Sequence, residues 1–320
     1  MKRVLCVLLC LIVQLQMIHA DSYCVLSGDD GTVIEEKNMN EPQSVASISK
    51  IMTAVVAIEE GNLKDTWKVG DEINNVIGSS IYLKVGQSVS LESLLYGLML
   101  RSGNDAALEI ALHTSGSEEA FVKAMNKKAQ EIGMLHTTFH NASGLDEEDE
   151  GNISTAYDMA LLMSYAMKNT TFQTITSSQY YTTEWNYRWK NKNRLLFEFA
   201  FTTGGKTGFT KQAGRTLVTS AQNNGVNSIV VTLQNSDDFA FHETKHKEVF
   251  DQYQTKEILA KGVYSIGKQY FEVEEPIKVT LQKGGKDQLQ VSSHMEKKQF
   301  VVEVVKNQVS NVYTYPLKKR

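Results

Sequence analysis

The hydrophobic pattern of the first half of the chain predicts one hairpin followed by several helices. Residues 23–26 and 32–34 are strand-forming and flank the turn sequence Gly28-Asp29-Asp30-Gly31, which is typical of a β-hairpin. Residues 47–61 are apolar nearly all round the helical period, so we expect a helix buried at the centre of a domain. Helical periodicity also predicts helices over 91–100, 106–113, 118–132 and 155–167.

After about Ser178 the pattern changes to that of strands. Strand composition covers 180–183, 216–220 and 228–233, with Gly204-Gly205 and Asn223-Asn224-Gly225 as predicted turns. A helix is expected over 241–259, and beyond it the sequence favours strands alone, over 277–281, 288–291, 300–305 and 312–315. We predict a main domain over 21–260 and a small C-terminal β domain over 261–320, near the lower size limit for independent folding.

Composition narrows the functional class. The 320 residues are 42% hydrophobic and 22% charged and include only 3 prolines, which excludes collagen-like, low-complexity and disordered chains. Lys and Arg number 33 against 37 Asp and Glu, a formal net charge of −4. A general nucleic-acid binder needs a basic face, so nucleic acid is not an expected partner.

The first twenty residues have the composition of a secretory signal peptide. Lys2 and Arg3 precede a mostly apolar run, and Ala20 is a small residue suited to cleavage. Gln14 and Gln16 interrupt the run, so a retained transmembrane helix is the weaker alternative. We predict a signal peptide over 1–20 and an exported protein, in the cell wall or at the outer face of the membrane of a bacterium, with no evident membrane anchor.

Cysteine usage agrees with this compartment. Cys6 and Cys10 lie within the signal, which leaves Cys24 without an internal disulfide partner. An exported protein without disulfides fits a bacterium better than a secreted eukaryotic domain. A lipoprotein anchor at Cys24 is disfavoured, because Asp21-Ser22-Tyr23 lacks the small apolar residues of such a site.

Ser47-Ile48-Ser49-Lys50 places a hydroxyl and an amine three residues apart at the start of the predicted buried helix. At that spacing both side chains face the same way, and a lysine that burial or another cation keeps neutral can take the serine proton. The motif is weak evidence alone, because Ser265-Ile266-Gly267-Lys268 repeats it where we expect a purely structural segment.

Two further motifs have both a functional and a structural interpretation. Ser102-Gly103-Asn104 brings a hydroxyl and an amide to the break between two predicted helices, although a helix N-cap would use the same residues. In a strand, Lys206 and Gly208 of Lys206-Thr207-Gly208 share one face, and the glycine allows a ligand to approach closely. The alternative is an edge strand protected by a lysine.

Taken together, these motifs follow the order S-x-x-K, S-x-N and K-T-G, which belongs to class A β-lactamases and penicillin-binding proteins. The chain resembles the low-molecular-weight penicillin-binding proteins that are serine D-alanyl-D-alanine carboxypeptidases of the peptidase S11 family, over roughly 22–259. The resemblance rests on Ala46-Ser47-Ile48-Ser49-Lys50-Ile51-Met52-Thr53-Ala54, Ser102-Gly103-Asn104-Asp105-Ala106, Gly144-Leu145-Asp146, Ser154-Thr155-Ala156 and Lys206-Thr207-Gly208-Phe209-Thr210.

The resemblance implies an α/β (α+β) fold of the β-lactamase and penicillin-binding-protein transpeptidase type. In this fold the N-terminal hairpin and the strands after Ser178 form an antiparallel sheet flanked by helices, with a helical lobe beside it and the site in the cleft between them. The implied activity is removal of the terminal D-alanine from peptidoglycan stem pentapeptides through an acyl-enzyme, with inhibition by β-lactams. No cofactor and no metal are expected.

The resemblance also implies roles for individual residues. Ser47 would be the nucleophile and Lys50 the general base, while Ser102 would relay the proton to the leaving D-alanine. Asn104 would hold both the substrate amide and Lys50 in place.

Four residues of the third motif would bind the substrate. Lys206 and Thr207 would grip the terminal carboxylate, Gly208 would allow close approach, and the backbone N–H of Phe209 would complete an oxyanion hole with that of Ser47. Phe209 stands where some relatives carry histidine, which bears on pH or substrate preference. Lys192, between Asn191 and Asn193, stands where an arginine is frequent, and we do not expect it to be catalytic.

Other functions remain as alternatives. A β-lactamase needs a carboxylate that activates the deacylating water, and Glu148 with Asn152 is the candidate, although the acidic run there suits a solvated loop. A non-catalytic penicillin- or wall-binding protein is the third possibility.

His242-Glu243-Thr244-Lys245-His246 matches the zinc motif H-E-x-x-H. Its charged neighbours favour the exposed face of an amphipathic helix, so we interpret it as surface rather than as a metal site.

Overall fold

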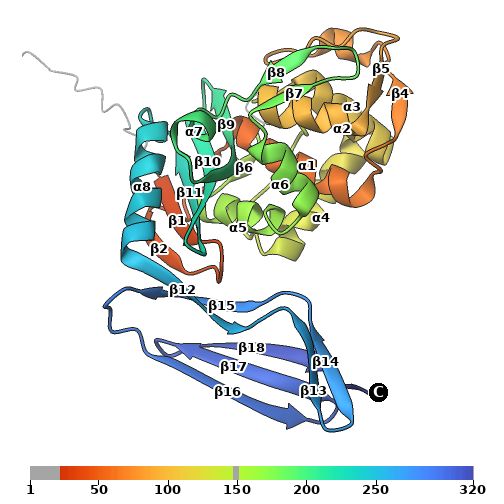
Figure 1. Ribbon diagram of the computed structural model, residues 1–320. Coiled ribbons are helices and arrows are strands. Elements are labelled where there is room, and N and C mark those ends of the chain that lie inside the picture. Colours follow the sequence, from red (N-terminus) through yellow and green to blue (C-terminus); the bar gives the residue numbers. More distant parts are fainter. Residues whose placement is uncertain (1–21, 147–150, 320) are drawn as a thin grey trace, which may run out of the picture.

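A five-stranded antiparallel sheet forms the centre of the main unit in the computed structural model, which describes residues 22–146 and 151–319 (Figure 1). Its strands are β1 (Ser22–Ser27), β2 (Val33–Lys37), β9 (Thr202–Thr210), β10 (Gly214–Asn223) and β11 (Val226–Leu233), in the spatial order β2-β1-β11-β10-β9. The predicted sheet is therefore confirmed. The predicted signal peptide and Glu148 lie outside the described residues.

Gly204 and Gly205 lie inside β9, so the turn predicted there is wrong. Gly205 has a φ of 152°, and a Cβ atom would lie 2.4 Å from the Val218 carbonyl oxygen; at Gly204 it would lie 2.4 Å from the Thr176 side chain. Both glycines are thus required by close packing around the strand and not by a reversal of the chain.

Helices cover both faces of the sheet (Figure 1). α8 (Asp238–Gln252) lies on one face, and α5 (Ala156–Ala166) and α6 (Thr170–Ser177) lie on the other. The helical lobe adds α1 (Lys50–Glu60), α2 (Leu91–Tyr96), a π-helical turn η3 (Gly97–Arg101), α3 (Asn104–Ser115) and α4 (Glu118–Ile132). The helices predicted over 47–61, 91–100, 106–113, 118–132 and 155–167 are confirmed. Helix α6 is additional: Asn169 caps this threonine-rich segment by accepting hydrogen bonds from the Thr171 and Phe172 N–H groups.

Short elements complete the main unit. Two-stranded pairs join β3 (Gln43–Ser44) to β6 (Ile153–Ser154), β4 (Thr66–Lys68) to β5 (Ser88–Ser90), and β7 (Tyr180–Thr182) to β8 (Arg188–Lys190). The remaining turns are η1 (Ala46–Ser49), η2 (Glu72–Asn75) and α7 (Leu195–Glu198). The strand predicted over 180–183 thus belongs to a separate hairpin and not to the main sheet.

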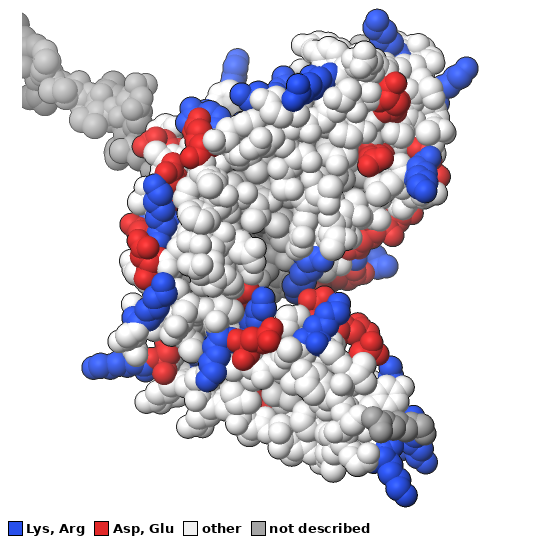
Figure 2. Space-filling model, viewed as in Figure 1, with Lys and Arg blue, Asp and Glu red and all other residues white. Residues whose placement is uncertain are grey.

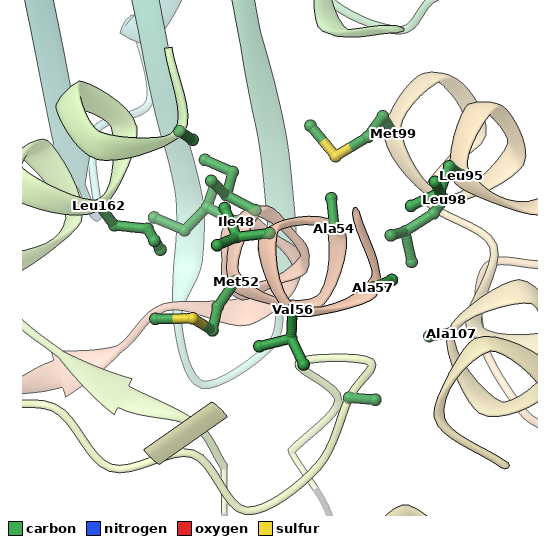
Figure 3. Close-up of a cluster of buried hydrophobic side chains, with 14 of the residues drawn as sticks. Ile48, Met52, Ala54, Val56, Ala57, Leu95, Leu98, Met99, Ala107 and Leu162 are labelled. Carbon is green, nitrogen blue, oxygen red and sulfur yellow. The ribbon is translucent and has the colours of Figure 1, made fainter. Parts of the chain in front are cut away.

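Helix α1 runs through the centre of the main core, as predicted from its apolar surface. Ile48, Met52, Ala54, Val56 and Ala57 lie around it and are all buried (Figure 3). The turn η1 leads directly into this helix, so the Ser47–Lys50 motif lies across the junction between η1 and the first residue of α1.

The C-terminal unit is built from strands alone. They are β12 (Tyr253–Leu259), β13 (Gly262–Ile266), β14 (Gln269–Val273), β15 (Ile277–Gln282), β16 (Leu289–Glu296), β17 (Gln299–Lys306), β18 (Val309–Pro316) and β19 (Lys318–Lys319). The helix predicted over 241–259 is wrong after Gln252, because residues 253–259 pair with β15. Pairing with a distant strand overrides the local pattern. The predicted domain boundary at 260 stays a prediction.

The turn between β1 and β2 joins the two units. Asp29 Oδ2 accepts a hydrogen bond from Thr255 Oγ1 at 2.7 Å, and Asp30 Oδ2 accepts one from the Thr280 N–H at 2.8 Å. Ser27 Oγ and Thr280 Oγ1 lie 2.6 Å apart. Figure 2 shows a hollow with charged side chains along its edge between the units. No helix within residues 22–146 and 151–319 is long and apolar enough to cross a membrane.

Candidate active site

Ser47 and Lys50 meet at the start of the central helix. The Lys50 side chain is completely buried, and its Nζ atom donates hydrogen bonds to Ser47 Oγ at 3.1 Å, to Asn104 Oδ1 at 2.7 Å and to the Ser143 carbonyl oxygen. The residue before the serine, Ala46, has a φ of 50°, a conformation rare for alanine. The predicted nucleophile and base are therefore in direct contact.

The second and third motifs meet beside this pair. Ser102 directly follows η3 and has a φ of 65°. Lys206 Nζ on β9 donates hydrogen bonds to Ser102 Oγ at 3.0 Å and to the Thr207 carbonyl oxygen at 2.6 Å. Asn104 begins α3 and already contacts Lys50. The fold thus brings three motifs that are distant in sequence into one site where β9 of the sheet meets the helical lobe.

Gly208 lets β9 approach the backbone of Ser47. A Cβ atom at this position would lie 3.0 Å from the Ser47 nitrogen and 2.3 Å from Thr216 Oγ1. Thr207 is half-buried, whereas the Phe209 side chain is 67% exposed. β9 is the outer strand of the sheet, so the cleft lies along an edge at which an extended peptide can add.

Burial and charge favour a neutral amine on Lys50. Burial, followed by the positive charge of Lys192, lowers the pKa of Lys50 to about 7, against a smaller opposing effect of Asp105. Burial, then Lys50 and Lys192, also lower the pKa of Lys206. Among residues 22–146 and 151–319, none of the three lysines forms an ion pair with a carboxylate. The cleft is therefore suited to an anionic group on its ligand.

Lys192 is a residue whose importance the sequence did not reveal. Its backbone N–H binds the Leu100 carbonyl oxygen at 3.1 Å, which places it beside η3, and its surroundings lower its own pKa, mainly through partial burial. Lys50 lowers the pKa of Lys206, whereas the cation that lowers the pKa of Lys50 is Lys192.

The rate at which penicillin acylates the protein should increase with pH as Lys50 loses its proton, and the substitution Lys192→Met should move this increase to higher pH. Without this charge the pKa of Lys50 rises, so less neutral amine is present near neutrality, and the acylation rate at pH 6.5 should fall about threefold. The measurement is the rate of acylation by penicillin between pH 5.5 and 9, with Lys190→Met on β8 as the control. Equal shifts in both variants, or none, would contradict this assignment.

Two acidic residues adjoin the motifs and organise the loops around them. Asp105 accepts hydrogen bonds from Ser80 Oγ at 2.6 Å and from the N–H groups of Ile81 and Leu83 at 3.0 and 3.1 Å. Asp146 accepts from Ser44 Oγ at 2.7 Å and from Thr210 Oγ1. One indication of these structural roles was visible in the sequence: Asp105 and Asp146 lie in two of the segments that resemble the family.

The interpretation of His242 and His246 as surface residues is wrong, because both are completely buried between α8 and the sheet. Thr219 Oγ1 lies 2.6 Å from His242 Nδ1 and 2.8 Å from His246 Nε2. The other ring nitrogens lie 3.0 Å from Thr232 Oγ1 and 2.9 Å from Ser228 Oγ. All four nitrogens are thus engaged by hydroxyls, and the described residues contain no group of three or more potential metal ligands.

This buried pair should make the protein sensitive to acid. Burial lowers the pKa of His246 to about 3, so below its ordinary value near 6.5 the unfolded chain binds a proton that the folded protein excludes. The free energy of unfolding should therefore fall by about 2 kcal/mol between pH 7.5 and 5 from His246 alone. Urea unfolding of wild type, His246→Gln and the partly exposed control His113→Gln measures this. A pH dependence unchanged in His246→Gln would contradict it.

Asn152 and Cys24, two residues considered in the sequence, are both buried in the structure. Asn152 is buried, and its Oδ1 atom accepts from the His140 N–H at 2.7 Å and the Asn141 N–H at 3.1 Å. It is therefore committed to holding the loop that carries Ser143. Cys24 is fully buried in β1.

The fold and site define a class of protein in which a serine hydroxyl lies beside a buried lysine amine, where an antiparallel sheet meets a helical lobe. The sequence model of peptidase S11, described as D-alanyl-D-alanine carboxypeptidase, matches residues 11–237. This chain belongs to that family of serine-type D-alanyl-D-alanine carboxypeptidases.

Relatives and solved structures agree with this assignment. The chain is 34% identical to D-alanyl-D-alanine carboxypeptidase DacF of Bacillus subtilis over 83% of its own length and 73% of that protein. It is 33% identical to DacC of Escherichia coli, of which it spans 61%. A D-alanyl-D-alanine carboxypeptidase structure from Mycobacterium tuberculosis matches with a TM-score of 0.67 and 29% identity, over 72% of this chain and 89% of that one. Penicillin binding protein 5 from Haemophilus influenzae shares the fold, with a TM-score of 0.75 and 23% identity over 93% and 96% of the two chains.

Proposed function

We propose that this protein removes the terminal D-alanine from peptidoglycan stem pentapeptides through an acyl-enzyme on Ser47, and that β-lactams acylate the same serine. The observation that carries the proposal is the contact between the buried Lys50 amine and Ser47 Oγ, next to a second buried amine, Lys206, that no described carboxylate neutralises. A base beside a nucleophile, with an unpaired amine nearby, suits attack on a peptide bond next to a free carboxylate.

Acylation begins when neutral Lys50 takes the proton of Ser47 as the serine oxygen attacks the carbonyl carbon between the two D-alanines. Backbone N–H groups of Ser47 and Phe209 stabilise the oxyanion. As the C–N bond breaks, Ser102 gives its proton to the nitrogen of the leaving D-alanine and receives the proton that Lys50 took from Ser47, so that Lys50 is neutral again. Water then attacks the ester carbon and gives a proton to Lys50, which returns it to the Ser47 oxygen as the ester bond breaks.

Substrate binding depends on Lys206, Thr207 and the outer edge of β9. A bound carboxylate raises the pKa of the Lys206 amine and holds it protonated, so the ion pair forms only with a ligand that ends in a free carboxylate. Asn104 keeps Lys50 oriented through Oδ1, while its Nδ2 donates to the Ile77 carbonyl oxygen at 2.8 Å.

We place this activity outside the cytoplasm of a bacterium, in the cell wall or at the outer face of the membrane. The signal-peptide composition of residues 1–20 and the extracytoplasmic location of peptidoglycan support this placement.

The test combines intact mass after incubation with penicillin and release of D-alanine from a short peptide ending in D-Ala-D-Ala. We expect one lasting adduct and release of D-alanine, with much slower release of D-alaninamide from the same peptide carrying a C-terminal amide. Consumption of penicillin without an adduct would favour a β-lactamase. No change in drug, protein or peptide would overturn the proposal.

A further inference from the structure

A second pair of acidic side chains lies behind the active site, where no step of the proposed reaction uses it. Glu109 on α3 is 1% exposed, and its Oε2 atom accepts a hydrogen bond from Trp67 Nε1 at 2.7 Å. Its other oxygen, Oε1, is buried without a hydrogen-bond donor among the described residues. The carboxylate of Glu72, on η2, lies within hydrogen-bonding reach of Glu109 and also accepts from the Gly70 N–H at 3.2 Å.

A buried carboxylate oxygen without a donor is costly, and two adjacent carboxylates cannot both ionise cheaply. One proton resolves both problems. If Glu109 Oε1 carries it, the oxygen becomes a donor to Glu72 and the pair bears a single negative charge.

The segment that this pair fastens also touches the catalytic machinery. Loop 69–87 contains Glu72 and, a few residues later, Ile77 and Ser79. The Ile77 carbonyl oxygen accepts a hydrogen bond from Asn104 Nδ2, and the Ser79 carbonyl oxygen accepts one from the Asn104 N–H at 2.7 Å. Asp105, one turn before Glu109 on α3, holds the far part of the loop. Helix α3 therefore secures the loop at two acidic residues, and the loop in turn fixes the amide that contacts Lys50.

We propose that Glu109 and Glu72 share one proton, and that this carboxyl–carboxylate pair holds loop 69–87 against α3 so that Asn104 stays aligned with Lys50. Both are positioning residues in this role. The proposal rests on the proposed function for its effect on acylation, but the proton-sharing pair itself does not depend on it.

The surroundings of the pair favour retention of the proton up to about neutral pH. Burial, opposed by the Trp67 hydrogen bond and assisted by the charge of Glu72, raises the pKa of Glu109 to about 7. The other ionisable groups nearby are Asp105 on the same helix and His113, which stacks on Trp67 with ring centroids 3.7 Å apart and pairs with Asp65 at 3.8 Å. Above neutral pH Glu109 ionises, the two carboxylates repel, and the loop loses its attachment at Glu109, while those at Asn104 and Asp105 remain.

The pair should therefore add a falling limb to the pH profile of acylation. Neutral Lys50 makes the rate rise towards neutrality, and loss of the shared proton should lower it about fivefold by pH 9.5, because Asn104 is then less well aligned. In Glu109→Gln the amide N–H₂ donates permanently to Glu72 and the amide oxygen still accepts from Trp67. This variant should keep the neutral-pH rate and lose the falling limb, and Glu109→Ala should be slow at every pH.

The experiment measures acylation by penicillin from pH 6 to 9.5 in wild type, Glu109→Gln, Glu109→Ala and the exposed control Glu119→Gln on α4. Hydrogen exchange of residues 69–83 is compared between wild type and Glu109→Gln at equal pH. We expect faster exchange in wild type at pH 9 and equal exchange at pH 6.

A falling limb in Glu109→Gln equal to that of wild type, or equal exchange in both proteins at pH 9, would overturn the proposal. Loss of the neutral-pH rate in Glu109→Gln would also overturn it, because it would mean that the carboxylate and not the proton is needed. If wild type is not acylated at any pH, the proposed function fails, while the exchange comparison still decides whether the pair shares a proton.

Discussion

Replacing Ser47 with alanine should abolish the penicillin adduct and lower the release of D-alanine by about 10⁴-fold or more. The reason is chemical, because alanine has no hydroxyl to attack the carbonyl carbon. Lys50 Nζ donates to Ser47 Oγ at 3.1 Å, whereas Ser102 Oγ is bonded to Lys206. Intact mass spectrometry after penicillin treatment, with D-alanine release measured on the same sample, provides both readouts.

The chain supplies a matched control for this substitution. Ser265-Ile266-Gly267-Lys268 repeats the motif in the C-terminal unit, where β13 ends at Ile266 and Gly267 turns the chain with a φ of 61°. The control variant Ser265→Ala should keep the adduct and wild-type release. An adduct that persists in Ser47→Ala would exclude Ser47 as the acylated residue.

Replacing Lys50 with methionine should lower the acylation rate by about 10³-fold while leaving the protein folded. Methionine has a similar length and no basic group, so it should fill this completely buried position with little loss of packing. The hydrogen bonds to Ser47 and Asn104 disappear together with the base.

The pH profile separates loss of the base from loss of packing. In wild type the acylation rate should rise as the pH passes about 7, because the neutral form of Lys50 is the active one and the pKa of this amine is lowered to that value. The residual rate in Lys50→Met should lack this rise. Circular dichroism and urea unfolding check that the variant is folded. A Lys50→Met variant that acylates at more than a tenth of the wild-type rate would contradict the assignment of Lys50 as the base.

Hydrogen bonds from the β1–β2 turn hold the C-terminal unit against the main unit. Ser27, Asp29 and Asp30 all reach strands of the other unit, and Lys278 Nζ lies 3.6 Å from Asp29 Oδ1. The two aspartates were predicted only as turn residues. Their side chains have a second role that no local pattern could show, since their partners lie more than 200 positions away.

Local patterns were sufficient for most of the architecture. The period of the apolar residues identified the central helix and the helices of the lobe, because a helix must bury a stripe of its own sequence. The three motifs named Ser47, Lys50, Ser102, Asn104 and Lys206, and the structure brings these residues into contact. The motifs are recognisable because nucleophile, base and anion-binding groups need particular side-chain types at fixed local spacing.

What the sequence could not determine depends on partners distant in the chain. Residues 253–259 look helical in isolation and become a strand because β15 lies beside them, and Gly204-Gly205 looks like a turn but fits a crowded strand. His242 and His246 look exposed because their neighbours are charged, yet hydroxyls from two strands satisfy both rings in the core. The influence of Lys192 on Lys50 and the pairing of Glu72 with Glu109 likewise arise only in the folded protein, because burial and the distance between charges are properties of tertiary packing.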